Sequence, residues 1–593
     1  MKTNIVNNLN KLRKLMKNNN IDAYIVPTND FHGSEYVGDY FKSRSFISGF
    51  TGSAGTVVIT QDEAGLWTDG RYFLQAEEEL MGSSINLYKM GEPNVPTIFE
   101  FLNQKLEKEC SIGFDGRVMS IDFVEQLKTV LSKKSINIFY QEDLIDQLWD
   151  NRPSISKEKA FELSHEYTGI NRIEKFKKVR EHLLELEADL LILTSLDDIA
   201  WLFNLRGNDV ACNPVLLSYA VISRDNVKLY VNEGVLSSEI IKNLNNDGVE
   251  ILSYNDIYND VKLFNDFTVV YQKNKLNYTL ASLINCKKVI NEVNYTTILK
   301  AEKNETEVKN SYYAHLKDGI AVTKFIYWLK TNVGKIYIDE ITAAEKLEEF
   351  RRQQENFMGI SFETIAGYKE HGAIIHYSAT EESKIEVLPK SFLLVDSGGQ
   401  YLEGTTDITR TISLGELSEK ERLYYTLVLK GHLDLSKAIF RSETTGAQLD
   451  ILARKHLYSH GLNYKHGTGH GVGSFLNVHE GPQNISPTPR AAYPFKEGMI
   501  TSNEPGIYLE NEFGIRIENL VVCKKYVENE FGKFLCFDDL TLVPYDIEAI
   551  DKTILSPDDI TNIHSYHARV YEALKDYLTA EEKEWLCNIK EAI

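Results

Sequence analysis

Along residues 1–150, apolar and polar positions form helix-like patterns that alternate with strand-like ones, which predicts a domain of helices and buried strands. Near the start of the chain apolar residues recur every three to four positions, which predicts an amphipathic helix with a face formed by Ile5, Leu9, Leu12 and Met16. Short apolar runs then predict buried strands at residues 23–26, 56–59 and 66–67. The stretch at 148–157, with Asn, Pro and Ser, interrupts the pattern and predicts a linker.

A second region repeats this order of elements. A helix that begins near Asn171 is followed by an apolar strand at residues 188–194, much as the first helix is followed by the strand at 23–26. Both strands lead into an acidic turn, at residues 29–30 and 197–198 respectively. We interpret the similarity as an internal duplication. The alternative is two unrelated α/β domains.

The rest of the chain has a different pattern. A long helix is expected at residues 302–329, strands separated by glycine-rich turns from 392 to about 543, and two helices at 567–577 and 580–589. This order predicts two α/β domains followed by an α+β domain. We place the three domains at residues 1–155, 156–300 and 301–545, and a helical C-terminal extension at 546–593.

Composition narrows the class of protein. With 593 residues and a formal net charge of −21, the chain is poorly suited to grip a phosphate backbone or an anionic membrane. Its six cysteines include no C-x-x-C pair, which disfavours a thiolate zinc site and a disulfide framework. The N-terminus lacks the apolar core of a signal peptide, and no apolar run is long enough to span a bilayer. A cytoplasmic protein without nucleic-acid or membrane partners is expected.

Several carboxylates stand at strand ends in the third region, where common catalytic signatures such as G-x-S-x-G and H-E-x-x-H are absent. Asp396 follows the apolar run 393–395, and Glu504 follows the strand at 499–503. Alternation at 407–412 places Asp407 with Thr409 and Thr411 on the polar face of a strand. The same alternation at 515–518 pairs Arg516 with Glu518, and a glycine-rich run at 467–473 contains His470.

These residues together favour a metal site over solvated strand-end acids, which is the simpler interpretation of each alone. Apolar runs lead directly into Asp396 and Glu504 and indicate burial. Buried carboxylates that lie together repel one another unless cations or protons neutralise them, and four carboxylates balance two divalent ions. An oxygen-rich ligand set with one imidazole suits Mn, Co or Mg.

The same segments carry a family resemblance. DSGGQYLEGTTDITRT, HGTGHGVGSFLNVHEGP, TSNEPGIYL and GIRIENLVV closely resemble the metal-ligand motifs of the aminopeptidase P (Xaa-Pro aminopeptidase) family. NDFHGSEY and RSFISGFTGSAG resemble its N-terminal domain. The resemblance implies two creatinase-like α/β domains followed by a pita-bread catalytic domain, as in the long, three-domain cytosolic form of the family.

The resemblance also implies roles for individual residues. Asp407 and Glu518 would bridge two divalent ions, most simply Mn(II) with Co(II) as a substitute; Asp396 would bind one ion and His470 with Glu504 the other. The implied reaction is hydrolysis of the bond between the N-terminal residue and a proline in second position, by a hydroxide that bridges the ions, with Glu504 also shuttling a proton. Its substrates are peptides that begin Xaa-Pro.

Further expectations concern the surroundings of the ions and the assembly. The family motif places three histidines around the substrate, and His376, His466 and His479 match them by position. We expect Arg516 to support Glu518 through a salt bridge, and we interpret the tyrosines and tryptophans elsewhere as core residues. The family commonly forms homodimers, and we expect one here.

Two rival functions stay open at this point. A prolidase, which is an Xaa-Pro dipeptidase, uses the same ligands but usually has one N-terminal domain. A pita-bread protein that binds peptides without cleaving them is a rival from another class, although such relatives lack ligand residues and all five are present here.

Overall fold

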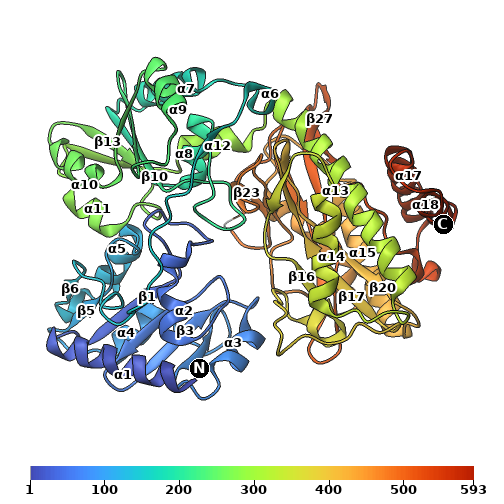
Figure 1. Cartoon of the computed structure of the whole chain (residues 1–593), viewed down its shortest axis with the longest axis horizontal. Coiled ribbons are helices and arrows are strands. Elements are labelled where there is room, and N and C mark those ends of the chain that lie inside the picture. Colours follow the sequence, from blue (N-terminus) through green and yellow to red (C-terminus); the bar gives the residue numbers. More distant parts are fainter. Residues whose placement is uncertain (1, 490, 593) are drawn as a thin grey trace. The chain divides into compact units, whose positions relative to one another are not determined.

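The computed structural model describes residues 2–489 and 491–592, which form two compact units. The first unit comprises the chain up to Leu163 together with Ile170–Thr296, and the second comprises Ser164–Gly169 together with the chain from Thr297. Figure 1 draws the first unit in blue to green and the second mainly in yellow to red. Among the described residues, no helix combines the length and the apolar character that crossing a membrane requires.

The first unit contains two six-stranded sheets of the same topology. The first sheet has the order β4-β3-β2-β1-β5-β6 and the second the order β12-β11-β10-β8-β13-β14. The strands of the first are β1 Ala23–Pro27, β2 Thr56–Thr60, β3 Ala64–Thr68, β4 Asn86–Lys89, β5 Ser111–Gly113 and β6 Asn137–Phe139. Those of the second are β8 Leu190–Leu193, β10 Ser218–Ser223, β11 Val227–Val231, β12 Val249–Ser253, β13 Thr268–Tyr271 and β14 Lys288–Asn291.

Strand directions match as closely as strand order. In each sheet the central strand, β1 or β8, pairs antiparallel with one neighbour and parallel with the other. The outermost pairs, β3–β4 and β5–β6 in one sheet and β11–β12 and β13–β14 in the other, are all parallel. The internal duplication that we inferred from two similar strands is therefore confirmed at the level of topology.

Helices pack on these sheets as the apolar spacing predicted. The first helix, α1 Lys2–Asn18, buries Ile5, Leu9, Leu12 and Met16 in one cluster with residues of β1 and β2. Asn171 caps α7 Arg172–Glu185 by accepting a hydrogen bond from the Glu174 N–H. The other helices of five or more residues within this unit are α2 Ser43–Ser48, α3 Phe73–Leu80, α4 Ile98–Lys105, α5 Ile121–Val130, α8 Leu196–Phe203, α9 Ser238–Asn246 and α11 Tyr278–Leu283. Residues 148–157 contain no helix or strand, as expected of a linker.

Two sheets of the second unit are each covered by a pair of helices. The three-stranded sheet β16-β17-β20 packs against α13 Glu305–Asn332 and α14 Glu340–Arg352 through a shared apolar cluster. The six-stranded sheet β21-β28-β27-β24-β22-β23 shares another cluster with α15 Glu419–Ser436 and α16 Gly446–Tyr458. The strands are β16 Ile365–Tyr368, β17 Phe392–Ser397, β20 Ile408–Ser413, β21 Ile439–Arg441, β22 Gly469–Gly471, β23 Glu480–Ile485, β24 Ile500–Asn503, β27 Asn519–Asn529 and β28 Gly532–Asp539.

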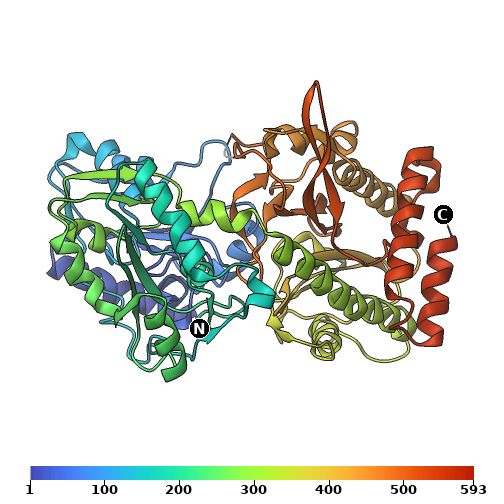
Figure 2. The same cartoon turned by 90° about the horizontal axis from the view of Figure 1, so that it is seen from above.

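Smaller elements complete the second unit. The strands β15 Phe357–Ile360, β18 Gly399–Tyr401 and β19 Gly404–Thr405 form a three-stranded sheet, and β25 Gly506–Leu509 pairs with β26 Phe513–Arg516. The C-terminal helices α17 Pro557–Leu574 and α18 Ala580–Glu591, red in Figure 2, lie side by side. Residues of both helices pack into one apolar cluster with α15 and β26.

The structure corrects three sequence-based expectations in this unit. We expected only strands and turns between residues 392 and 543, but α15 and α16 lie there, each with a capping box at its start. The long helix begins at Glu305 instead of Glu302, because Asn304 accepts hydrogen bonds from the N–H groups of Thr306 and Glu307. The helix α17 begins ten residues earlier than expected, since Ser556 caps it and Pro557 occupies its first turn.

Two buried histidines tie α15 and α17 to the loop at Tyr545. The hydroxyl of Tyr545 contacts His432 Nε2 at 3.1 Å, and the Tyr545 N–H donates to His567 Nε2 at 3.1 Å. Burial first, and the charge of Arg410 second, lower the pKa of each histidine to about 3. Both rings are therefore neutral in the folded protein.

These histidines predict a loss of stability in acid. Below pH 6.5 they take up protons in the unfolded chain but not in the folded one, so the free energy of unfolding falls as the pH decreases. A folded-state pKa of 3 corresponds to about 3 kcal/mol per histidine at pH 4 relative to pH 7. We expect His567→Gln to unfold with a shallower dependence on pH between 4 and 6.5, measured by denaturant titration at each pH. An unchanged slope would contradict this account.

Candidate metal centre

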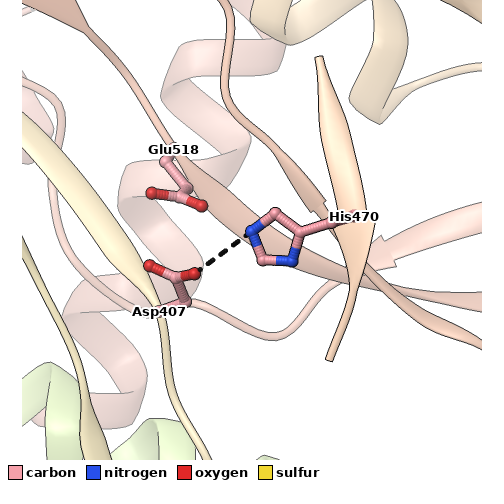
Figure 3. A group of neighbouring side chains, drawn as sticks. All are labelled: Asp407, His470 and Glu518. Carbon is pink, nitrogen blue, oxygen red and sulfur yellow. Dashed lines mark ion pairs between the residues drawn. The ribbon is translucent and has the colours of Figure 1, made fainter. Parts of the chain in front are cut away.

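Three side chains from separate segments of the second unit converge on one point. Asp407 lies just before β20, His470 lies on β22, and Glu518 lies between β26 and β27. One ligand atom from each lies within 4.8 Å of those of the other two, and Asp407 Oδ2 is 3.4 Å from His470 Nε2. Figure 3 shows both carboxylates turned toward the imidazole ring. This is a group that can hold a metal ion.

Glu504 lies beside this group and contacts His470. Its Oε1 lies 3.5 Å from His470 Nε2 and accepts a hydrogen bond from the Ser502 hydroxyl at 3.1 Å. Strand β22, which carries His470, lies close to β24, which ends just before Glu504, because Gly469 has no side chain: a Cβ there would lie 1.9 Å from the Ser502 carbonyl oxygen. The same Ser502 hydroxyl accepts from the His470 N–H at 2.9 Å, so it holds both residues.

Asp396 reaches the group from the neighbouring strand. It lies on β17 opposite Thr409 of β20, and the Thr409 hydroxyl donates to Glu518 Oε2 at 2.8 Å. Arg516 Nη2 donates to Asp396 Oδ2 at 2.6 Å, while Asp396 Oδ1 is buried and has no hydrogen-bond partner among the described residues. We expected Arg516 to form its salt bridge with Glu518, but it forms one with Asp396 and is linked to Glu518 through the Thr409 hydroxyl.

Three carboxyl groups of this cluster, those of Asp396, Glu504 and Glu518, have raised pKa values. Burial raises the pKa of Asp396 to about 6, although Arg516 opposes the shift. Burial also raises the pKa of Glu504, and burial together with the charges of Asp407 and Glu504 raises the pKa of Glu518 well above its ordinary value. Without cations these three carboxyl groups would therefore hold their protons to a higher pH than usual, which is the expected behaviour of a site built for positive ions.

The imidazole of His470 is oriented as a metal ligand. Its Nδ1–H donates to the Gly471 carbonyl oxygen at 3.0 Å, so Nε2 is the nitrogen that faces Asp407 and Glu504 and would bind a metal ion there. Burial alone would lower the pKa of His470, but Asp407 and Glu504 outweigh it and raise the pKa to about 9. Four carboxylates and one correctly oriented imidazole fit divalent ions that prefer oxygen ligands.

The three further histidines surround this cluster in different ways. The ring centroids of His479 and His470 are 4.3 Å apart, and the two rings meet edge to face. The backbone beside His376 approaches the cluster, because Arg516 Nη2 donates to the Ile375 carbonyl oxygen at 3.4 Å. His466 contacts the cluster through Tyr508, whose hydroxyl lies 2.8 Å from His466 Nε2.

Tyr508 is a site residue that the sequence reasoning assigned to the core. The Gly467 carbonyl accepts from His466 Nδ1, so His466 Nε2 accepts a hydrogen bond from the Tyr508 hydroxyl, and Arg516 Nη1 donates to the same hydroxyl at 2.7 Å. Tyr508 thus joins His466 to the arginine that holds Asp396. Its position four residues after Glu504, on β25, is the one signal that could have indicated this.

Comparison with protein families covers almost the whole chain. Residues 8–148 and 151–307 each match the creatinase/prolidase N-terminal domain. Residues 312–525 match metallopeptidase family M24, and residues 533–593 match the C-terminal region of peptidase M24. The fold and the site therefore define a metallopeptidase preceded by two creatinase-type domains.

Individual relatives narrow the class. Xaa-Pro aminopeptidase 1 of Dictyostelium discoideum is 40% identical over 97% of this chain and 94% of its own length. The probable Xaa-Pro aminopeptidase P of Botryotinia fuckeliana is 40% identical over 98% of this chain and 91% of its own. The chain belongs to the Xaa-Pro aminopeptidase P family of M24 metallopeptidases.

Solved structures agree with this assignment. The X-prolyl aminopeptidase of Caenorhabditis elegans, described as a cytosolic enzyme with a di-nuclear active site, matches with a TM-score of 0.95 and 32% identity over 99% of both chains. The Xaa-Pro dipeptidase of Bacillus anthracis matches with a TM-score of 0.51 and 23% identity. This match covers 99% of the dipeptidase chain but 63% of the present chain, so the dipeptidase shares the fold of a part of this protein.

Proposed function

We propose that this protein is an Xaa-Pro aminopeptidase, which removes the N-terminal residue from peptides with proline in second position. One observation carries the proposal: a chain similar along nearly its full length to Xaa-Pro aminopeptidases brings Asp407, His470 and Glu518 together, with Glu504 beside them. Hydrolysis of an Arg-Pro-Pro peptide by the metal-loaded protein, but not of the matching peptide with alanine in second position, tests it. A metal-loaded protein that cleaves no Xaa-Pro peptide would contradict it.

The five clustered residues would hold two divalent ions. We assign Asp407 and Glu518 as the bridging carboxylates, Asp396 to one ion, and His470 with Glu504 to the other. The proximity of the Asp407, His470 and Glu518 ligand atoms and the raised pKa values of Asp396, Glu504 and Glu518 support this assignment. Mn(II) is the proposed native metal, with Co(II) as a substitute, because the donor set is rich in oxygen.

Bound divalent ions acidify water and polarise a carbonyl oxygen, and both effects favour peptide hydrolysis near neutral pH. The protein's own part is to position the substrate and to move protons. Glu504 is the proposed proton carrier: its Oε1 faces His470 Nε2 and the Ser502 hydroxyl, and its side chain is 17% exposed. There it can accept a proton and release it to the amine that leaves.

Selectivity for proline follows from the chemistry of the substrate. The nitrogen of the scissile bond carries no hydrogen when proline follows, so it offers the enzyme no donor. Recognition therefore depends on the shape of the pocket and on donors to the carbonyl oxygens. We propose that His376 and His479 supply these donors and that His466, held by Tyr508, helps to order the side of the site beside Asp396.

Removal of either donor histidine should lower turnover strongly. Loss of a donor to a developing oxyanion typically costs on the order of a hundredfold. We expect this loss for His376→Ala and for His479→Ala, measured as kcat/KM on an Xaa-Pro-Pro peptide with equal metal content. His460→Ala, at an exposed histidine, is the matched control and should behave as the wild type. If both variants keep near-normal kcat/KM, the two histidines are merely structural.

Peptide length distinguishes the aminopeptidase from a prolidase. A prolidase cleaves dipeptides, whereas the proposed enzyme cleaves Xaa-Pro bonds in longer peptides. The full-length matches with Xaa-Pro aminopeptidases, beside the partial match with an Xaa-Pro dipeptidase, favour the aminopeptidase. Cleavage of dipeptides alone would reverse this choice, and metal binding without any hydrolysis would favour a peptide-binding module.

The proposal extends to domain limits, location and assembly. The matched family ranges end or begin near the divisions that we propose at residues 155, 300 and 545. A cytoplasmic location is proposed, in line with the cytosolic relative from Caenorhabditis elegans.

We further predict a homodimer. Sedimentation at micromolar concentration should show a species with twice the chain mass of 67.8 kDa. A single species of 67.8 kDa across that range would contradict the prediction.

A further inference from the structure

Glu340, a carboxylate outside the metal cluster, holds the chain segment at residues 368–385, which carries His376. Glu340 is the first residue of α14 and its side chain is fully buried. Its two oxygens accept hydrogen bonds from four residues: Tyr368 N–H at 2.8 Å, His371 Nδ1 at 2.9 and 3.0 Å, the Tyr377 hydroxyl at 2.8 Å and Ile385 N–H at 3.2 Å. All four donors come from one stretch of chain, residues 368–385.

This arrangement is not needed to form the helix. The start of α14 is capped by the preceding residue, Asp339, which accepts from the Thr342 N–H at 2.7 Å. A buried carboxylate is costly unless donors surround it, and here the donors are supplied by the His376 segment. The contacts of Glu340 therefore order that segment.

The contacts lie on both sides of His376 in the chain. Tyr377 follows His376 directly, and its hydroxyl donates to Glu340. The centroid of its ring lies 4.5 Å from that of His371, another residue that donates to Glu340. Ile375 precedes His376 directly, and its carbonyl accepts from Arg516. The backbone on either side of His376 is thus joined to Glu340 on one side and to the arginine of the metal cluster on the other.

Close packing leaves the segment little freedom. At Gly514 on β26, a Cβ would lie 1.7 Å from the Gly372 carbonyl oxygen, so the turn at residues 369–373 rests directly on this strand. Gly372 lies between the Glu340 partners His371 and Tyr377, so a displacement of these contacts would be transmitted along the packed segment to His376.

We propose that Glu340 is a positioning residue that holds His376 in its place for catalysis. The inference rests on the proposed function, because it requires that His376 contacts the substrate. Glu340 itself acts through the Tyr368, His371 and Tyr377 contacts and takes no part in binding the ions. A displaced catalytic group can lower the rate by up to about a hundredfold without loss of the fold.

A double-mutant cycle in the full-length, metal-loaded enzyme tests the proposal. Glu340→Gln keeps the shape of the side chain but turns one acceptor oxygen into a donor. We expect kcat on an Xaa-Pro-Pro peptide to fall by about tenfold to a hundredfold, with KM and metal content unchanged. In a His376→Ala background the same change should have no further effect, since the group it positions is gone.

Matched variants separate positioning from general destabilisation. Asp559→Asn removes a buried charge outside this segment, which is paired with Lys430, and should change stability but not kcat. Tyr377→Phe removes one hydroxyl from Glu340 and should lower kcat by a smaller factor, also only when His376 is present. It replaces Glu340→Gln in the cycle if that variant does not fold.

The outcomes are distinguishable. A normal kcat in the Glu340→Gln enzyme, or losses that multiply fully with His376→Ala, would overturn the inference and leave the proposed function intact. A normal kcat in His376→Ala alone would overturn it as well, by removing its target. Absence of Xaa-Pro hydrolysis in the metal-loaded wild type would contradict the proposed function itself, and the inference with it.

Discussion

Removal of divalent ions by a chelator should abolish hydrolysis of Xaa-Pro peptides, and Mn(II) should restore it best, followed by Co(II). Acidification of water and polarisation of the carbonyl both depend on the ions, so no slower route through the protein groups alone is expected to remain measurable. The measurement is kcat on an Arg-Pro-Pro peptide before chelation, after it, and after each metal is returned.

The metal-free protein should also differ in stability. Asp396, Glu504 and Glu518 have raised pKa values in the fold, so near neutral pH the cluster is destabilised by their mutual repulsion and burial. Bound cations remove this cost, and thermal unfolding should accordingly shift upward when metal is added. Full activity in a sample shown to be metal-free would overturn the site assignment.

A substituted ligand provides the control for chelation. Asp407→Asn should reduce the metal content and remain inactive when Mn(II) is returned, because Asp407 belongs to the group that converges on one point. Asp559→Asn changes a buried carboxylate that pairs with Lys430 outside the cluster, and should keep both metal and activity.

Conversion of Glu504 to Gln should lower kcat by about a hundredfold to ten-thousandfold, the usual contribution of a positioned proton carrier. The amide has the same shape and can still accept from the Ser502 hydroxyl, so the fold should be preserved. It cannot take up a proton, and it is a weaker ligand than a carboxylate.

Metal analysis of the same variant separates these two losses. Inactivity with near-normal metal content indicates loss of the proton carrier, whereas inactivity with reduced metal content indicates loss of a ligand. Glu504→Asp retains the carboxylate and should be more active than Glu504→Gln at equal metal content. Wild-type turnover in Glu504→Gln would refute both roles.

Much of the fold and of the ligand set could be predicted from local sequence pattern. The spacing of Ile5, Leu9, Leu12 and Met16 predicted the buried face of α1, because the helical period determines which side chains share a face. Alternation at residues 407–412 predicted that Asp407, Thr409 and Thr411 share the polar face of a strand. In the structure Thr409 and Thr411 hydrogen-bond to Glu518 and to the Arg516 backbone, while Ile408 and Ile412 on the other face enter the core.

Other features were missed although a local signal was present. The helices α15 and α16 lie in a stretch that we expected to form only strands, although each begins at a residue followed by Glu or Gln three positions later. The glycine-rich turns on either side are typical of strand-rich regions, and they led to a prediction of strands for the whole stretch. The duplicated domains were indicated by two similar strands, but the identity of their topology required the sheets themselves.

The sequence by itself determined the residue types of the candidate site and the strand ends at which they lie. Only the tertiary structure decided their partners: Arg516 pairs with Asp396 across 120 residues, Tyr508 joins Arg516 to His466, and Glu340 holds the His376 segment. The physical reason is that helical and strand periods are properties of the local backbone, which the neighbouring residues reveal. Which polar groups meet depends on how sheets formed from distant segments pack and align, and no local period records that alignment.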